Sequence, residues 1–279
     1  MSLFSKDSCL LITSSSHDHA QKSALKLFEK LKNQGYSVYL DTFLAKKEGS
    51  PEHSCPNTKV DLIFVFGGDG TILKTFATWK NSPIFGVNCG KVGFLTEIQP
   101  EEVDEALVKL ENKEYFVEDY YTIDVSSENS PTVPAANDAI VTSDKIGHVI
   151  TLGVHIDDQF LYTLNSDGLI IATSTGSSAY SLSAGGSLIV PSIEAITLVP
   201  ICPISRSIVP MVFSLESTIK VTNLSEYRSG SVVIDGRTYF SLGYEESIEI
   251  KKSSEKISFV RFADNYVSRV REKLLKFNL

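Results

Sequence analysis

The sequence VDLIFVFGGDGT at residues 60–71 decides the fold of the first part of the chain. Its apolar half, Val60–Phe66, predicts a buried strand, and its glycines predict a turn that leads into a helix from about Thr71. A second apolar run, Ile84–Val87, predicts the next strand. A strand, a helix and a strand in succession favour a parallel sheet with crossover helices, which is an α/β fold.

The residues before this stretch repeat the alternation. Cys9–Thr13 and Tyr36–Leu40 predict strands, and the helical period of Asp18–Gln34 predicts a helix between them that Gly35 terminates. The polar stretch Thr42–Lys59 is expected to be a mobile loop. These patterns predict an α/β domain over residues 1–116.

The second half of the chain is mostly β. Short β-rich runs follow one another from about Tyr115, with turn signals between them, and predict a β-rich, sandwich-like domain over residues 117–263. The dipeptide Asp235-Gly236 between two such runs predicts a hairpin turn. A helical period returns at Asp264, so residues 264–279 are expected to form a helix that packs back on the first domain.

Composition and charge argue against several classes of function. The chain has 279 residues, with 26 basic and 34 acidic side chains and a net charge of −8. Because no basic cluster is present, this charge argues against binding to nucleic acid or to an anionic membrane. The sequence has no stretch that approaches the ~18 apolar residues of a membrane span. Four scattered cysteines without a C-x-x-C pair indicate a reduced, cytoplasmic protein, and the five histidines form no metal-binding motif.

A protein with a net negative charge needs a local phosphate-binding motif to bind phosphate, and GGDG at residues 67–70 is a candidate. Glycines let backbone N–H groups turn toward a ligand at a helix N-terminus, so Gly67, Gly68, Gly70 and Thr71 are predicted to bind phosphate. A carboxylate in such a cradle needs a role, either in holding a divalent cation or in accepting a proton from an attacking hydroxyl. The alternative is a plain tight turn with Asp69 as the helix N-cap.

Two further motifs carry groups that suit a nucleotide. Residues 167–186 supply many hydroxyl and N–H donors next to glycines, and Asp167 suits a pair of ribose hydroxyls or an adenine amino group. Asn137 and Asp138 match the donor and acceptor edge of adenine. The alternatives are an ordinary loop for the first motif and a turn before a strand for the second.

Taken together, these motifs resemble those of NAD kinases. The resemblance extends from about Asp61 to the C-terminal helix, and GGDGT alone would not specify the family, because diacylglycerol-type lipid kinases and phosphofructokinases carry variants of it. The long motif at residues 167–195 is the specific one. The matching segments, in the order and spacing of that family, are GGDGT at 67–71, NCGKVGFLTE at 88–97, Asn137-Asp138, DGLIIATSTGSSAYSLSAGGSLIVPSIEA at 167–195 and Asp235-Gly236.

The resemblance implies a reaction and a fold. The reaction is transfer of the γ-phosphoryl group of ATP, or of polyphosphate in some members, to the 2′-hydroxyl of the adenosine ribose of NAD, which forms NADP. The fold is a two-domain NAD kinase fold, with a Rossmann-like α/β domain, a β-rich C-terminal domain and NAD between them. Mg²⁺ is expected to arrive with ATP rather than in a dedicated protein site. A homodimer or homotetramer is expected, with no nucleic-acid or membrane partner.

The resemblance also implies roles for individual residues. Asp69 is the expected proton acceptor, and it is also expected to contact NAD. Lys74, one turn into the helix, is placed to reach phosphate. The residues expected to bind NAD besides Asp69 are Gly70, Lys74, Phe94, Asn137, Asp138, His148, Asp167, Thr175, Ser178, Ala179, Tyr180, Ser181, Leu182, Ser183, Cys202, Ile204 and Asp235.

Three positions depart from the family pattern. Asp138 stands where the family has glutamate, which shortens the side chain by one methylene, and Ser174 stands where the family has proline. Ser178 stands where the family has a second threonine, which keeps the hydroxyl and drops a methyl group. Two other functions remain open, namely a lipid or sugar kinase with the same GGDGT turn and a nucleotide-binding sensor without turnover. A lipid kinase would need an apolar or basic membrane-facing surface, and this sequence shows neither. The presence of Asp69 argues against a pure sensor, because a protein that only binds a nucleotide has little reason to keep a carboxylate beside the phosphates.

Overall fold

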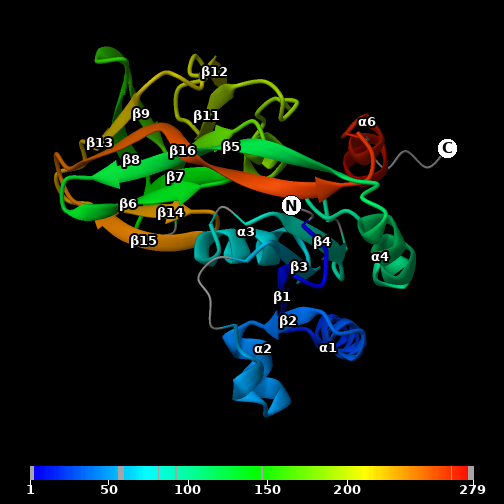
Figure 1. The fold of residues 1–279 in the computed structure, drawn as a ribbon. Coiled ribbons are helices and arrows are strands. Elements are labelled where there is room, and N and C mark those ends of the chain that lie inside the picture. Colours follow the sequence, from blue (N-terminus) through cyan, green and yellow to red (C-terminus); the bar gives the residue numbers. More distant parts are fainter. Residues whose placement is uncertain are drawn as a thin grey trace. The chain divides into compact units, whose positions relative to one another are not determined.

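The computed structural model describes residues 3–55, 60–80, 82–91, 93–145, 147–264 and 266–275, which form two compact units (Figure 1). Unit 1 comprises Met1–Asp119 and Ile257–Leu279, and unit 2 comprises Tyr120–Lys256. The chain passes from unit 1 to unit 2 within strand β5 (Phe116–Ser127) and returns within strand β16 (Ser247–Arg261). The C-terminal segment therefore belongs to the same unit as the N-terminal residues.

Unit 1 has the α/β architecture that the strand and helix alternation predicts. Its strands pair in the order β2-β1-β3-β4-β16, and each of these pairings is parallel. The short crossovers between these strands contain helices, as parallel pairing requires. The elements are β1 (Cys9–Ser14), α1 (Asp18–Asn33), β2 (Ser37–Leu40), α2 (Thr42–Glu48), η1 (Pro51–His53), β3 (Leu62–Gly67), α3 (Asp69–Thr78), β4 (Ile84–Asn88), η2 (Pro100–Glu102), α4 (Val103–Glu111), α6 (Tyr266–Arg269) and the π-helical turn η4 (Val270–Leu275).

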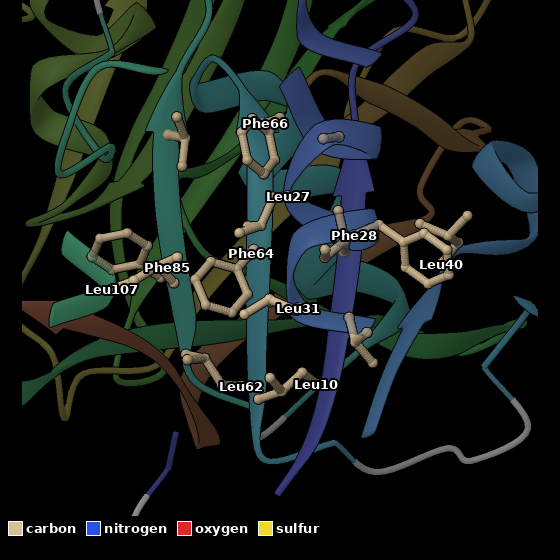
Figure 2. Close-up of a cluster of buried hydrophobic side chains, with 14 of the residues drawn as sticks. Leu10, Leu27, Phe28, Leu31, Leu40, Leu62, Phe64, Phe66, Phe85 and Leu107 are labelled. Atoms are coloured by element: carbon tan, nitrogen blue, oxygen red, sulfur yellow. The ribbon is translucent and has the colours of Figure 1, made fainter. Parts of the chain in front are cut away.

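The core of unit 1 fixes the central strand β3. Figure 2 shows Phe64 and Phe66 of β3 among Leu27, Phe28 and Leu31 of α1. All six residues of β3 are buried, because in a parallel sheet helices cover both faces. The turn that follows β3 is therefore anchored at the carboxyl end of a rigid strand.

The prediction of a mobile loop over Thr42–Lys59 is wrong for most of that stretch. Helix α2 begins there with Asp41 as its N-cap, whose carboxylate accepts from the N–H of Leu44 at 2.7 Å, and it ends at Gly49 with a φ of 82°. The polar composition hid these two cap signals, although the helix buries Leu44 and Ala45. Residues 56–59 lie outside the described part of the chain.

At the C-terminus, the expected helix from Asp264 is observed from Tyr266 to Leu275. It has one α-helical turn, α6, followed by the π-helical turn η4. Residue 265 and residues 276–279 lie outside the described part of the chain. The described turns carry Arg269 and Lys273, two cations of unit 1.

Unit 2 is the β-rich, sandwich-like domain that the sequence predicts. One antiparallel sheet has the order β12-β11-β10-β7-β14-β15, and the other has β16-β13-β8-β9, with β5 beside β16 and β6 beside β5. Val141 and Ile171 of the first sheet share a buried core with Leu152 and Val221 of the second. The strands, besides β5 and β16, are β6 (Ser130–Ala135), β7 (Asp138–Ser143), β8 (Ile150–Ile156), β9 (Gln159–Ser166), β10 (Gly168–Thr173), β11 (Ala195–Ile201), β12 (Met211–Ser214), β13 (Ile219–Asn223), β14 (Gly230–Ile234) and β15 (Arg237–Leu242).

The predicted hairpin turn at Asp235-Gly236 is confirmed. It joins β14 to β15 as a two-residue loop, and both residues have positive φ angles, 46° and 76°. Positive φ at both central positions is the type I′ geometry, which matches the twist of paired strands. The turn therefore needs residues that tolerate the left-handed region at both positions.

Candidate active site

The GGDG turn holds its aspartate by two backbone N–H groups of unit 1. Strand β3 ends at Gly67, and α3 begins at Asp69 with Gly68 as its N-cap, so the alternative of Asp69 as the N-cap is wrong. Oδ2 of Asp69 accepts from the N–H of Phe94 at 3.0 Å, and Oδ1 accepts from that of Leu95 at 2.9 Å. Each oxygen keeps a further lone pair. The half-buried carboxylate is therefore fixed in direction and can still accept a proton.

The turn at residues 93–97 supplies those two N–H groups. Gly93 has a φ of 61°, and a Cβ there would come within 2.5 Å of Cγ of Asn88, so the position requires glycine. The hydroxyl of Thr96 donates to the carbonyl of Gly93 at 2.8 Å. Phe94, an expected NAD contact, is buried and packs edge-on against Tyr266 with ring centroids 5.7 Å apart. The motif at residues 88–97 therefore builds a support for Asp69.

A cavity of about 400 Å³ opens beside this turn in unit 1. A Cβ added to Gly68 or to Gly70 would have no heavy atom of the described chain within 4 Å, so both glycines face open space. Gly67 differs, because a Cβ there would overlap the side chain of Thr71. The cavity is lined by Ser14, Ser15, Ser16, His17, Phe43, Gly68, Gly70, Thr71 and Lys74.

Sequence reasoning missed the Ser14–His17 side of this cavity. Ser14 is the last residue of β1, and Ser15 and Ser16 follow it. β1 pairs with β3 in parallel, so both strands bring their carboxyl ends to the same sheet edge. A run of hydroxyls at the end of an apolar strand was the available signal, since ligands of open α/β sheets bind at that edge. Lys74 lines the same cavity, as its expected role in phosphate binding requires.

In unit 2, Asp235 organises the turn that carries Asn137 and Asp138. Its buried carboxylate accepts from the N–H groups of Ala136 at 2.9 Å, Asn137 at 2.8 Å and Asp138 at 3.2 Å. Burial raises the pKa of Asp235, and these three N–H groups oppose that rise. Within this chain, the observed contacts of Asp235 are with the Asn137-Asp138 turn, a role that the hairpin signal alone did not reveal.

The side chains of that turn are buried with polar atoms available. Oδ1 of Asn137 is buried and has no hydrogen-bond partner among the described residues. A buried amide oxygen without a partner costs free energy, so it points to a donor supplied by a ligand. Burial, together with the charge of Asp235, raises the pKa of Asp138 to about 7. Near neutral pH, Asp138 can therefore donate a proton as well as accept one.

Replacing Asp138 with asparagine tests this pKa through stability. Because the folded-state pKa lies above the usual 3.8, folding favours the protonated form, and stability falls as pH rises from about 4 to about 7. Between about pH 5 and pH 8 this group should remove about 3 kcal/mol from the free energy of unfolding, a loss absent from Asp138→Asn. Urea unfolding followed by circular dichroism measures the difference. The exposed control Asp158→Asn should keep the wild-type pH dependence.

The segment after β10 wraps around the same turn. The hydroxyl of Thr173 donates to the carbonyl of Ala136 at 2.7 Å and accepts from the N–H of Gly176 at 3.0 Å. A Cβ on Gly176 would overlap the carbonyl of Asn137, so only glycine permits this approach. The tertiary structure thus brings together two motifs that lie more than thirty residues apart in the sequence.

The hydroxyl run from Gly176 contains the short helices η3 (Gly176–Ser178) and α5 (Tyr180–Ser183). Some hydroxyls serve the fold, because those of Ser174 and Ser177 donate to the backbone carbonyls of Ile193 and Ser174. Ser181 is fully buried beside the hydroxyl of Thr197. The more accessible predicted residues of this run are Ser178, Ala179, Tyr180, Leu182 and Ser183.

The remaining predicted NAD contacts lie at the other end of β10. Asp167 precedes β10, and its N–H donates to the carbonyl of Ile201, next to Cys202. The N–H of Ile204 donates to the carbonyl of Asn165, and the exposed His148 precedes β8. β10 rises about 3.3 Å per residue, so its six residues separate these groups from Asn137 and Thr175 by about 20 Å. The structure of one chain therefore gives two clusters of predicted contacts.

The described residues also bear on a divalent ion. Among them, no three His, Cys, Asp or Glu side chains lie together as a metal site. Mg²⁺ prefers oxygen ligands and is commonly bound through one or two carboxylates together with substrate phosphates. Asp69 lies between Gly68 and Gly70, which line the cavity, although Asp69 itself is not part of that lining. A single carboxylate of this kind fits an ion that enters on a phosphate ligand.

The described helices include none long and apolar enough to cross a membrane.

Comparison with solved structures agrees on the fold. An Archaeoglobus fulgidus NAD kinase in complex with ATP is 30% identical, with a TM-score of 0.78 over 96% of this chain and 99% of that one. A yeast NADH kinase complexed with NADH has a TM-score of 0.87 at 24% identity, over 97% of this chain and 88% of that one, and supports the fold alone.

Sequence comparison identifies the family. The chain is 38% identical to an NAD kinase of Methanothermobacter thermautotrophicus over 79% of this chain and 78% of that protein. It is 35% identical to an NAD kinase of Thermococcus sibiricus over 93% and 95% of the two chains. The family model of the ATP-NAD kinase N-terminal domain matches residues 9–115, and that of the C-terminal domain matches residues 136–262. With both domains matched and the GGDGT and Asn137 turns built as described, the chain belongs to the NAD kinase family.

Proposed function

We propose that the chain transfers the γ-phosphoryl group of ATP to the 2′-hydroxyl of the adenosine ribose of NAD, with Asp69 as the proton acceptor. Membership of the NAD kinase family makes the chain a phosphotransferase. The geometry of Asp69 is the observation that supports its role as the proton acceptor. Both of its oxygens are held by N–H groups, while the glycines on either side face an open cavity.

The proposed step balances without a covalent enzyme intermediate. The ribose 2′-oxygen forms a bond to the γ-phosphorus, the bond from that phosphorus to the bridging oxygen of ADP breaks, and the hydroxyl proton passes to Asp69. Phosphoryl transfer depends chiefly on positioning and on neutralisation of charge, so a carboxylate fixed by two N–H groups suits it. Mg²⁺ on the triphosphate would supply the charge neutralisation that this acidic chain lacks.

The cavity beside the GGDG turn is the proposed site of the phosphoryl donor. Gly68, Gly70 and Thr71 stand at the N-terminus of α3, where N–H groups and the helix dipole favour phosphate. The hydroxyls of Ser14–Ser16 offer further donors, and Lys74 adds a cation at the cavity wall. These residues fit a polyphosphate chain, so inorganic polyphosphate is a reasonable second donor to assay.

Replacing Lys74 with methionine should raise the KM for ATP about tenfold, because one charge-assisted contact to phosphate is lost. Lys74 is also among the expected NAD contacts, but it lines the proposed donor cavity and the contacts of Asn137 and Asp138 are untouched, so the KM for NAD should change less than twofold. Initial-rate kinetics with each substrate varied in turn measure both constants. Lys22→Met, at an exposed position of α1, is the matched control and should leave both unchanged. An unaltered KM for ATP in Lys74→Met would remove Lys74 from the donor site.

We propose that NAD binds at the Asn137 turn of unit 2. The unpartnered Oδ1 of Asn137 would accept from an amino group of the dinucleotide, and Asp138 would contact adenine or ribose. The remaining proposed contacts of this cluster are Thr175, Ser178, Ala179, Tyr180, Ser181, Leu182 and Ser183. The second cluster, His148, Asp167, Cys202 and Ile204, lies at the far end of β10, which is consistent with a homodimer or homotetramer in which another copy completes the site. A cytoplasmic setting fits the reduced thiols expected from the sequence.

A coupled assay tests the function directly. Purified protein is mixed with NAD, ATP and Mg²⁺, and an NADP-specific dehydrogenase reports the NADP formed. We expect NADP formation that depends on all three components. NAD binding without NADP formation from ATP or polyphosphate would support the sensor instead, and phosphorylation of diacylglycerol or of a sugar phosphate in preference to NAD would support the rival kinases.

A further inference from the structure

The C-terminal segment of unit 1 holds the turn that fixes Asp69. Nη1 of Arg261 donates to the carbonyl of Leu95 at 3.0 Å and pairs with Glu97 at 3.1 Å. The N–H of Phe262 donates to the other oxygen of Glu97 at 2.9 Å. The ring of Tyr266 packs against Phe94. These contacts tie residues 94–97 to a segment about 165 positions further along the chain.

Lys273 adds a contact of a different kind. Its ammonium donates to the carbonyl oxygen of Gly93. That carbonyl belongs to the same peptide group as the N–H of Phe94, which donates to Oδ2 of Asp69. A trans peptide points its C=O and N–H in opposite directions, so the two hydrogen bonds form one chain from Lys273 through the peptide to Asp69. Hydrogen bonds in such a chain polarise and strengthen one another.

The surroundings of Lys273 place its charge near Asp69. The residue is half-buried, although it lies in the last described turn of the chain. Burial lowers the pKa of Lys273, and the positive charges of Arg269 and Arg261 lower it further. The negative charges of Asp69 and Glu97 act in the opposite direction and raise this pKa. Arg261 and Arg269 also pair with Glu118, at 3.2 and 3.6 Å. Three cations thus meet three carboxylates next to the 93–97 turn. A lysine on an ordinary solvated helix face would instead extend into water.

We propose that Lys273 is a positioning residue for Asp69, acting through the Gly93–Phe94 peptide to hold the carboxylate in place. This inference rests on the proposed role of Asp69. It gives the C-terminal helical segment a function that motif comparison did not assign, since the expected site residues end at Asp235. Lys273 polarises the peptide that holds the base and does not itself touch the reacting atoms.

The test compares Lys273→Met with Lys273→Arg and with the exposed control Lys22→Met. Methionine keeps the length of the side chain but removes the donor and the charge, whereas arginine keeps both. For Lys273→Met we expect kcat to fall about tenfold, with the KM values for NAD and ATP within about twofold of wild type. Lys273→Arg should restore kcat, because it keeps both the donor and the charge, and Lys22→Met should not change it.

A second readout is independent of activity. Native-state hydrogen exchange of the peptide that contains Phe94 and Leu95 should speed up in Lys273→Met and stay slow in Lys273→Arg. If the methionine variant does not fold, Lys273→Gln, which removes the charge, should show the same fall in kcat and the same faster exchange.

The outcomes separate the two proposals. A wild-type protein that forms no NADP would contradict the proposed function, while exchange at Phe94 would still test the role of Lys273. With an active wild type, an unchanged kcat and unchanged exchange in Lys273→Met would overturn the inference. A raised KM for ATP with unchanged kcat would also overturn it, because Lys273 would then bind the phosphoryl donor.

Discussion

Asp69→Asn should lower kcat for NADP formation by about 10³-fold, because the amide cannot accept the proton of the 2′-hydroxyl. Asparagine has one acceptor oxygen, whereas Asp69 accepts from two backbone N–H groups, so the variant should also lose about 1–3 kcal/mol of stability. The fold should persist, since the unit 1 core lies on β3 and α1 rather than on this side chain. The coupled NADP assay and urea unfolding measure the two effects.

The matched control for this variant is Asp157→Asn. The carboxylate of Asp157 also accepts two hydrogen bonds, from the N–H of Thr218 at 2.8 Å and from the hydroxyl of Ser217 at 3.1 Å. It should lose a similar amount of stability and keep wild-type activity. If Asp69→Asn kept more than about a tenth of the wild-type kcat, Asp69 would not be the proton acceptor.

Asp235→Ala should weaken NAD binding by at least about tenfold and destabilise unit 2 by about 4 kcal/mol. Three backbone N–H groups of the Asn137 turn lose their acceptor, and alanine at a φ of 46° adds strain. Without the charge of Asp235, the pKa of Asp138 should fall from about 7 toward its usual range. Isothermal titration with NAD and urea unfolding measure affinity and stability.

Asp235→Asn should have a smaller effect than Asp235→Ala, because asparagine keeps one acceptor oxygen and tolerates the left-handed region. Asp157→Ala, at a φ of 49°, reproduces the strain away from the proposed NAD residues and should leave NAD affinity unchanged. Wild-type NAD affinity in Asp235→Ala would show that the Asn137 turn does not depend on its three hydrogen bonds for binding.

Local signals predicted much of the fold. The apolar runs at β1, β3 and β4, the helical period of α1 and the Asp235-Gly236 turn each depend on residues close together in the chain. Such patterns record the backbone conformation that a short segment prefers. The same approach failed at α2, where cap residues at both ends were present but a polar composition outweighed them. Elements with a clear apolar or helical pattern were therefore predicted correctly, and the polar helix α2 was not.

The motifs also predicted the family, because GGDGT and the long run at residues 167–195 are specific in combination. They identified Asp69 as the carboxylate of interest from its place between glycines after a strand. They did not identify Ser14–Ser16, whose approach to GGDG depends on the pairing of β1 with β3. They also left open which serine hydroxyls serve the fold and which face solvent.

The sequence by itself therefore determined the α/β and β-rich halves, the hairpin at residue 235 and the chemical groups of the site. Only the tertiary structure decided which groups hold one another. Asp69 meets the N–H groups of residues 25 and 26 positions away, Asp235 meets the Asn137 turn across 97–99 positions, and Lys273 meets Gly93 across 180. Backbone propensities act over a few residues, whereas these partners are chosen by how strands pair and pack, which no local pattern encodes.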